Sequence, residues 1–146
     1  MTNQLEIETQ PMALLVQKGP LIINTINGKP FTGIGVVYHG NLNNPFDLGK
    51  TIARIAYKNG KRDGLCKYFY KKGQLRSKRN YKNNKQEGLW EQFHQNGKLK
   101  FRRNYNNGTP QGPFAEFYEN GQLRLKGNYN NGKHHGLWEA HHKNGK

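Results

Sequence analysis

Pairs of cations recur at a fixed spacing along the second half of the chain. Two basic residues separated by one position return every 24 residues: Arg76 and Lys78, Lys100 and Arg102, Arg124 and Lys126. Guanidinium and ammonium groups bind carboxylate and phosphate oxygens through charge-assisted hydrogen bonds. The formal net charge of +15, from 24 lysines and arginines against nine acids, favours anionic partners. The six residues therefore predict a basic face that binds an acidic protein surface, an anionic lipid or a nucleic acid.

Arginine and large aromatic residues form a second candidate site. Its members are Arg79, Trp90, Arg103, Phe114 and Trp138. Tryptophan and arginine are enriched at the energetic centres of protein interfaces. Guanidinium groups also stack on aromatic rings inside a single molecule. This aromatic face therefore predicts either a protein-binding surface or a structural core with cation–π contacts.

The residue types needed for catalysis are scattered. Asp63, Glu87, Glu116 and Glu119 are not paired with a nucleophile in any recognisable arrangement. Cys66 occupies the position that an aromatic residue fills in later copies of the repeat described below, so we interpret it as a small core residue. We expect no enzyme, no cofactor and no small-molecule substrate.

Histidines near the C-terminal end are the one candidate for a metal site. No cysteine or acid completes a tetrahedral ligand set at a fixed spacing from them. We interpret them as ordinary turn and strand residues and expect no metal site. The four are His134, His135, His141 and His142.

The elements that must position these residues follow from a 24-residue repeat, which Gly64, Gly88, Gly112 and Gly136 mark. Numbering each repeat from its first glycine, the paired cations are positions 13 and 15. The predicted organisation is a leader or cap at 1–19 and a repeat sheet at 20–146, with a degenerate start at 20–63, full repeats at 64–87, 88–111 and 112–135, and a partial repeat at 136–146.

Two turn signals divide each repeat. Asn-Gly at positions 9–10, as in Asn96-Gly97, and at positions 20–21, as in Asn107-Gly108, predicts two-residue type I′ hairpins. Two short strands per repeat remain between them. The sequence therefore predicts an all-β fold, an elongated single-layer antiparallel β-meander of hairpins. In the degenerate start we expect strands at 21–26, 33–39 and 51–57, with a loop at 40–48.

Two-residue turns would fix which side chains share a face. They place Leu75, Leu99 and Leu123 with the aromatic face, and Phe69, Phe93 and Phe117 with the cations. The same register sets Glu91 between Arg76 and Arg102, and Glu139 opposite Arg124. Two acids leave four of the six cations uncompensated, so a solvated face with ion pairs is the alternative to a binding surface.

Several segments resemble MORN repeats, namely Tyr105-Asn-Asn-Gly, Gly88-Leu-Trp-Glu-Gln-Phe and the stretch 129–139. The Asn-Gly-x-Leu turns at 96–99 and 120–123 look most like the bacterial variant of this family. The resemblance covers residues 50–146 well and 20–49 weakly, and it implies a rod-like antiparallel sheet without a catalytic centre. It also implies an antitoxin or immunity protein of the YwqK type, which neutralises a partner toxin by binding it. Other MORN proteins are linked to acidic phospholipids or to scaffolding.

We therefore expect a non-enzymatic binding protein with a protein partner, either a toxin or another acidic-surfaced protein. The alternative is a peripheral binder of anionic membrane lipid or nucleic acid. The apolar stretch at 12–16 is too short for a secretory signal, and no apolar run reaches the roughly 18 residues of a membrane span. We expect a cytoplasmic protein, with peripheral attachment to the membrane as the alternative.

Overall fold

The computed structural model describes residues 9–11, 15–18, 21–24, 28–38 and 51–144. This part of the chain is all β, and no described segment forms a helix that could cross a membrane. Its strands are β1 (Thr9–Pro11), β2 (Leu15–Lys18), β3 (Leu21–Asn24), β4 (Gly33–Tyr38), β5 (Thr51–Lys58), β6 (Lys61–Arg62), β7 (Gly64–Phe69), β8 (Leu75–Lys82), β9 (Lys85–Phe93), β10 (Leu99–Asn106), β11 (Thr109–Phe117), β12 (Leu123–Asn130) and β13 (Lys133–Ala140).

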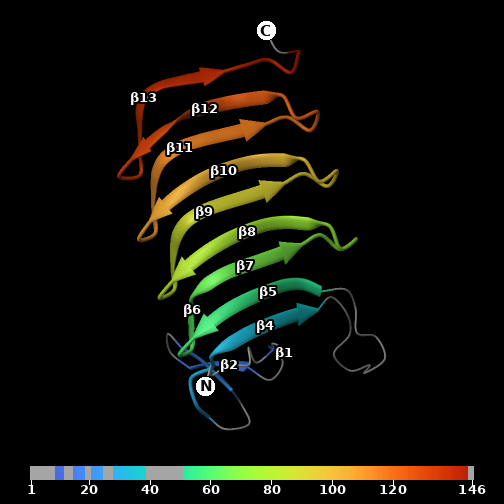
Figure 1. Cartoon of the computed structure of the whole chain (residues 1–146), viewed down its shortest axis with the longest axis vertical. Coiled ribbons are helices and arrows are strands. Elements are labelled where there is room, and N and C mark those ends of the chain that lie inside the picture. Colours follow the sequence, from blue (N-terminus) through green and yellow to red (C-terminus); the bar gives the residue numbers. More distant parts are fainter. Residues whose placement is uncertain (1–8, 12–14, 19–20, 25–27, 39–50, 145–146) are drawn as a thin grey trace, which may run out of the picture.

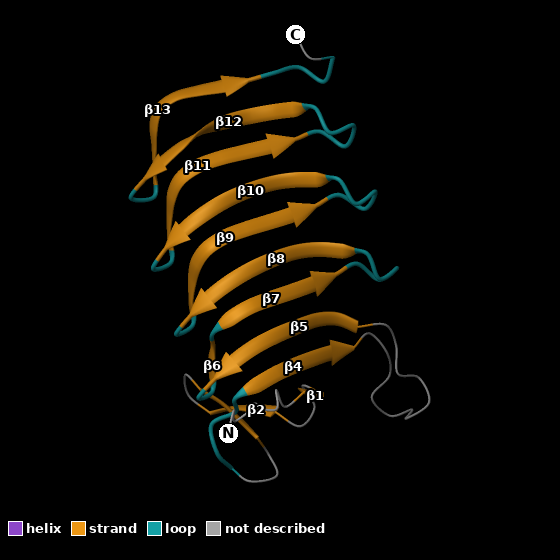
Figure 2. Ribbon diagram, in the orientation of Figure 1, coloured by secondary structure: helices purple, strands orange, loops and turns teal. Residues whose placement is uncertain are grey.

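One open sheet contains most of these strands, in the order β1-β4-β5-β7-β8-β9-β10-β11-β12-β13, with β6 paired to β5. From β4 onward every pairing is antiparallel and joins strands that are close in sequence. Figure 1 shows the hairpins stacked along the longest axis of the molecule, and Figure 2 shows turns at both ends of the strands. The predicted single-layer meander of hairpins is confirmed.

The N-terminal strands pair differently from the prediction. The sequence predicts the strand at 21–26 as part of the repeat sheet, but β3 pairs with β2 in a separate two-stranded sheet. The outer neighbour of β4 is instead β1, which runs parallel to it. The predicted loop at 40–48 lies outside the described residues. A parallel neighbour cannot come from a tight turn, so turn signals alone could not indicate this pairing.

The turns at positions 20–21 are the predicted type I′ turns. Both central residues have positive φ, 50° and 84° at Asn107 and Gly108, and 49° and 69° at Asn83 and Asn84. The backbone twist of this turn matches that of the flanking strands. Asparagine enters the left-handed region more readily than other non-glycine residues, which explains why Asn84 replaces glycine there.

The turns at positions 9–10 are not type I′, and this part of the prediction is wrong. Only the glycine has positive φ, 95° at Gly73 and 83° at Gly97. The amide of Gly73 donates to the carbonyl of Tyr70 at 2.8 Å, and the amide of Tyr70 donates to the carbonyl of Gln74 at 2.8 Å. This is a three-residue loop that combines a tight turn with a glycine in the left-handed region.

A three-residue loop changes the face of the residue that follows it. Leu75 lies opposite Phe69, and its equivalents Leu99 and Leu123 lie opposite Phe93 and Phe117. The three leucines therefore share the face of the phenylalanines, not the aromatic face where they were predicted. A bulge at position 13 then restores the predicted register along the rest of each hairpin.

A second irregularity lies where the chain enters the next repeat. The predicted two-residue turn at Asn83-Asn84 would set Arg79 opposite Gly88. In the structure Arg79 pairs with Trp90, because residues 87–89 bulge opposite the single residue between Arg79 and Tyr81. Gly88 has a φ of 73° at this bend. The shift amounts to two residues, so it changes cross-strand partners but keeps every side chain on its predicted face.

Candidate binding surface on the charged face

A row of side chains, all but one of them charged, crosses the sheet from β5 to β13. Each member lies directly opposite the next on the neighbouring strand, and directly opposite residues point to the same side of a sheet. We call this set the charged row, and the side of the sheet that carries it the charged face. In order, the row consists of Arg54, Lys67, Lys78, Glu91, Arg102, Ala115, Lys126 and Glu139.

The two acids of the row form ion pairs with lysines. The Nζ atom of Lys78 lies 2.6 Å from Oε2 of Glu91, and that of Lys126 lies 3.0 Å from Oε2 of Glu139. The remaining cations, Arg54, Lys67 and Arg102, form no ion pair with any described residue. Five cations against two acids leave the row with an excess of three positive charges.

The predicted partners of the two acids are corrected in part. Glu91 does lie opposite Arg102, as expected, but its other neighbour is Lys78 and not Arg76. Glu139 lies opposite Lys126 and not Arg124. The cause is the two-residue shift at the glycine bend, which moves each acid along the strand to face position 15 instead of position 13.

The six predicted cations therefore separate into two groups. Lys78, Arg102 and Lys126 stand in the charged row, whereas Arg76, Lys100 and Arg124 are the extra residues of the position-13 bulges. Arg124 forms an ion pair with Glu116. The six cations therefore do not form one uniform basic face. Three of them belong to the continuous charged row, and the three at position 13 lie at bulges beside it.

Arg54 and Lys67 belong to the row but were not among the predicted residues. Both side chains are exposed. Arg54 lies 24 residues before Lys78, so carrying the repeat frame one step back into the degenerate start would have identified it. Lys67 occupies position 4, where later repeats carry Glu91, Ala115 and Glu139, and this variation hides the position from a search for recurring cations.

Apolar side chains flank the charged row on both sides. On one side the Phe–Leu pairs at positions 6 and 12 run along the three-residue loops. On the other side, leucines at position 2 are unusually exposed for their type: Leu65 at 42%, Leu89 at 38% and Leu137 at 75%. A charged strip between apolar strips resembles the mixed composition of protein interfaces more than a purely ionic surface.

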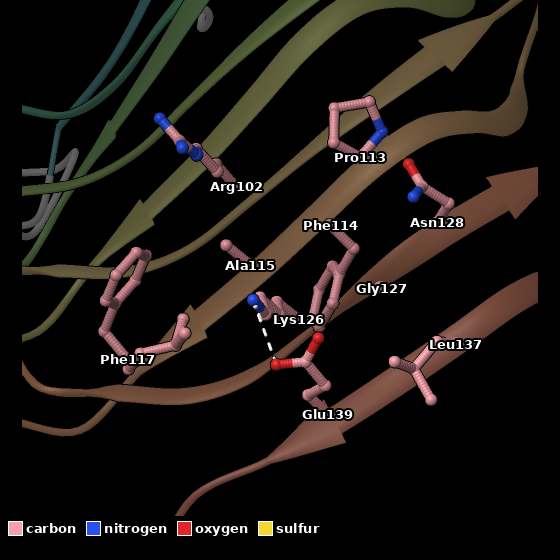
Figure 3. A pocket seen from close by; sticks show the side chains of 11 residues that line it. Arg102, Pro113, Phe114, Ala115, Phe117, Lys126, Gly127, Asn128, Leu137 and Glu139 are labelled. Atoms are coloured by element: carbon pink, nitrogen blue, oxygen red, sulfur yellow. Dashed lines mark ion pairs between the residues drawn. The ribbon is translucent and has the colours of Figure 1, made fainter. Parts of the chain in front are cut away.

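A hollow of about 620 Å³ opens in the charged face over β10 to β13. Ala115, the one small residue of the charged row, lies on its floor between Arg102 and Lys126. Figure 3 shows Phe117 at one side of this hollow, Leu137 at the other and the Lys126–Glu139 ion pair between them. The hollow exists because alanine stands where other repeats have a long charged side chain.

The predicted aromatic face lies on the opposite side of the sheet, where Phe114 is buried and the other four residues are half-buried. The guanidinium carbon of Arg79 lies 4.5 Å from the ring centre of Trp90, and that of Arg103 lies 4.9 Å from the ring centre of Phe114. Phe114 is 7% exposed. The Nε atoms of both arginines and the indole nitrogen of Trp90 are buried. These contacts support the core interpretation of this face.

Trp138 ends the aromatic face in a different way. The repeat position of Arg79 and Arg103 is occupied by Gly127, and a Cβ atom built there would lie 2.3 Å from Cδ2 of Trp138. The indole ring thus packs directly on the glycine backbone. His134 stacks on the same ring at 4.0 Å between ring centres. No three His, Cys, Asp or Glu side chains within the described residues are grouped in a way that could hold a metal ion.

Two ionisable groups on this face favour their neutral forms. Burial raises the pKa of Tyr68 to about 12, and the neighbouring Tyr81 and Cys66 act in the same direction. Burial also raises the pKa of Cys66, which is fully buried. A thiol reacts as its thiolate, and a phenol accepts a proton only as its phenolate. These environments therefore suit packing and not nucleophilic or base chemistry.

Comparison with known proteins supports the repeat assignment. The family model described as MORN repeat variant matches three consecutive segments, 62–83, 86–107 and 110–131. No curated protein matches the chain. These three segments are therefore similar to MORN-type repeats, which agrees with the sheet of hairpins in the structure. Repeats of this family generally act as binding modules for proteins or membrane lipids, and proteins built from them are generally not enzymes.

Proposed function

We propose that the protein binds the acidic surface of a partner protein through its charged face, and that it thereby neutralises a toxin as an antitoxin or immunity protein. The charged row carries this proposal. It offers an excess of three positive charges between two strips of partly exposed apolar side chains. Such a surface complements a partner that carries carboxylates beside apolar side chains.

The composition of the row favours a protein over a bare polyanion. Glu91 and Glu139 interrupt the cations and would repel closely spaced phosphates. Exposed leucines such as Leu89 gain nothing from a hydrated phosphate backbone but can be buried against a protein. For the same reason we propose a cytoplasmic location, where a free protein partner would be met.

One observation favours the second candidate, an anionic membrane surface. Arg54, Lys67 and Lys78 are three consecutive cations on neighbouring strands, about 5 Å apart from strand to strand. No acid of the row lies between them. This end of the row could lie on acidic lipid headgroups, which would place the protein at the membrane periphery.

The test is co-expression with the products of the adjacent genes. A neighbouring product that stops growth should be tolerated when the wild-type protein is present, and the two proteins should purify together. An Arg102→Glu variant should lose rescue, whereas Arg76→Glu, a matched reversal at a bulge outside the row, should retain it.

Salt and vesicles separate the two candidates. Binding to a protein should weaken only several-fold between 50 and 500 mM NaCl, whereas polyanion binding through several phosphate contacts should fall by orders of magnitude. Steeply salt-dependent binding to phosphatidylserine vesicles, without any protein partner or rescue, would replace the first proposal with the second.

A further inference from the structure

We propose that the hollow over Ala115 receives an extended acidic segment of the partner protein, with a carboxylate on Arg102 and apolar side chains against Ala115 and Leu137. This inference rests on the proposed function, because it assumes that the partner is a protein, and it assigns the contact to one place on the charged face. It follows from three properties of the hollow: an unpaired cation, apolar walls and a defined length.

The unpaired cation is Arg102. Its cross-strand neighbours are Glu91 and Ala115. The Oε2 atom of Glu91 already lies 2.6 Å from Lys78, and alanine offers no charge. The guanidinium group of Arg102 is exposed and forms no ion pair with any described residue. It therefore presents a planar fork of donors, which matches a carboxylate, at one end of the hollow.

The other cation of the hollow is already paired. Lys126 contacts Glu139 at 3.0 Å, so it adds little attraction for a second acid. A ligand with several closely spaced anionic groups would also meet the carboxylate of Glu139, which lines the same hollow. The hollow thus accepts one carboxylate at the Arg102 end and disfavours a polyphosphate or a run of acids.

Apolar surface forms the rest of the hollow. Ala115 provides the floor. Phe117 lines one side of the hollow, and Leu137 with Pro113 lines the other. Leu123, directly opposite Phe117 on the neighbouring strand, also lines the hollow. Leu137 is 75% exposed. Burying this side chain against an apolar partner removes unfavourable hydration of its surface. An occupant must therefore bring apolar side chains as well as its carboxylate.

The length of the hollow fixes the spacing of these side chains. Arg102 is on β10 and Leu137 on β13, three strands apart. Neighbouring strands are about 4.8 Å apart, so measured across the strands the two ends of the hollow are separated by about 14 Å. Four steps of an extended chain cover about the same distance, and alternate residues point the same way. The occupant should therefore carry an acid at its first position and apolar residues at the third and fifth.

The test uses defined peptides and the full-length protein labelled with ¹⁵N. The probe is an acetylated, amidated pentapeptide of sequence Glu-Ser-Leu-Ser-Leu, added at 150 mM NaCl. Its control contains glutamine in place of glutamate. We expect saturable shifts of the amide signals of Ala115, Arg102 and Leu137 with the acidic peptide, and binding at least tenfold weaker with the control.

Substitutions in the protein locate the contact. Ala115→Leu should fill the hollow, and Arg102→Gln should remove the carboxylate partner, so each should abolish the shifts. Arg76→Gln removes a cation that lies outside both the charged row and the hollow, and it should leave the shifts unchanged. Leu137→Ser, at an exposed position, provides a second change in the hollow if Ala115→Leu disturbs the fold by circular dichroism, and it should weaken binding severalfold.

Several results would overturn the inference. Equal binding of the two peptides, shifts confined to residues outside the hollow, or a response to Arg76→Gln equal to that of Arg102→Gln would each do so. If inositol hexakisphosphate bound at the same residues more tightly than the acidic peptide, the inference would also be overturned. A toxic neighbour that is bound and neutralised equally by wild type and Ala115→Leu would refute the hollow as the contact while leaving the proposed function intact. Specific binding of the acidic peptide in the hollow, together with a failure to find any protein partner, would support the hollow as a binding site and refute the proposed function.

Discussion

Gly127 shows how one residue changes the chemistry of a repeat. At the same position Arg79 and Arg103 stack on aromatic rings, with Arg103 donating to the hydroxyl of Tyr129 at 3.1 Å. At Gly127 the side chain is missing and Trp138 occupies the space. The glycine is not required by an unusual backbone angle, because its φ is not positive. It is required by the closeness of the indole ring.

We therefore predict that Gly127→Ala destabilises the protein by about 1–3 kcal/mol, the usual cost of forcing extra atoms into a packed site. The new Cβ would meet Cδ2 of Trp138 at 2.3 Å, and a rigid ring cannot give way as a flexible chain end can. Urea unfolding followed by tryptophan fluorescence measures the effect. Asn130→Ala, at an exposed position of the same strand, is the control. Equal stability of the two variants would show that Trp138 does not depend on the glycine.

At the scale of the elements, side chains from one hairpin hold the turn of the next. The amide of Asn107 donates to Oε2 of Glu87 at 2.7 Å, and the amide of Asn131 donates to Oε1 of Gln111 at 2.8 Å. Asp63 accepts from the amide of Asn83 in the same way, at 3.3 Å. Two of the scattered acids that could be considered for catalysis, Asp63 and Glu87, are thus acceptors that order type I′ turns.

Removing one of these acceptors should weaken its hairpin. We predict that Glu87→Ala lowers the free energy of unfolding by about 1 kcal/mol, the net value of a partly exposed hydrogen bond to a charged group. Glu87→Gln should retain most of the stability, because Gln111 performs the same role in the next repeat. The urea midpoint of each variant gives the measurement, with Glu119→Ala, an exposed acid outside these turns, as control. A loss as large for Glu87→Gln as for Glu87→Ala would contradict this role.

The turns also explain how far the sequence could predict the structure. Asn107-Gly108 and Asn96-Gly97 are the same dipeptide, yet the first forms a type I′ turn and the second belongs to a three-residue loop. Over the middle of each hairpin, the repeat correctly predicted the cross-strand register and the face of the sheet on which each side chain lies. The face on which Leu75 lies was not predicted correctly. It depends on the number of residues in the loop, and the Asn-Gly dipeptide does not specify that number.

The candidate site was predictable to a similar degree. The recurrence of cations located Lys78, Arg102 and Lys126 on one face, and the structure places them in one row. The cross-strand partner of Glu139 was not predicted correctly. Gly136 has a positive φ and lies in a bulge of β13, and no local sequence pattern distinguishes such a bulge from a simple bend. The hollow was missed because it depends on Ala115, which is conspicuous only when compared with residues on neighbouring strands.

At the scale of the whole molecule, charge is distributed unevenly. Residues 51–146 carry 21 basic residues and six acids, whereas residues 1–50 have three of each. Within the row, Arg54, Lys67 and Lys78 lie side by side on neighbouring strands. Like charges directly opposite one another destabilise a sheet. The folded molecule therefore tolerates repulsion at the surface that we propose for binding.

Salt should relieve this repulsion. We predict that raising NaCl from 0.05 to 0.5 M increases the free energy of unfolding in urea by about 1 kcal/mol, because screening acts within about 10 Å at moderate ionic strength. Lys67→Glu places an acid between two cations and should show a smaller response to salt. Lys143→Glu, an exposed change outside the row, is the control for net charge. A loss of stability with salt would show that the ion pairs at Glu91 and Glu139 outweigh the repulsion.

The stacking of hairpins makes the charged face a modular surface. Each repeat contributes two strands, so consecutive repeats are displaced by about 10 Å along the sheet. The repeats share their strand register, and within the charged row the residue that varies most from one repeat to the next is that at position 4: Lys67, Glu91, Ala115 or Glu139. Exchanging Ala115 with Glu91 would move the hollow by one repeat without a change in the fold. Duplication and single substitution would therefore suffice in evolution to lengthen the surface and to reposition its hollow for a new partner.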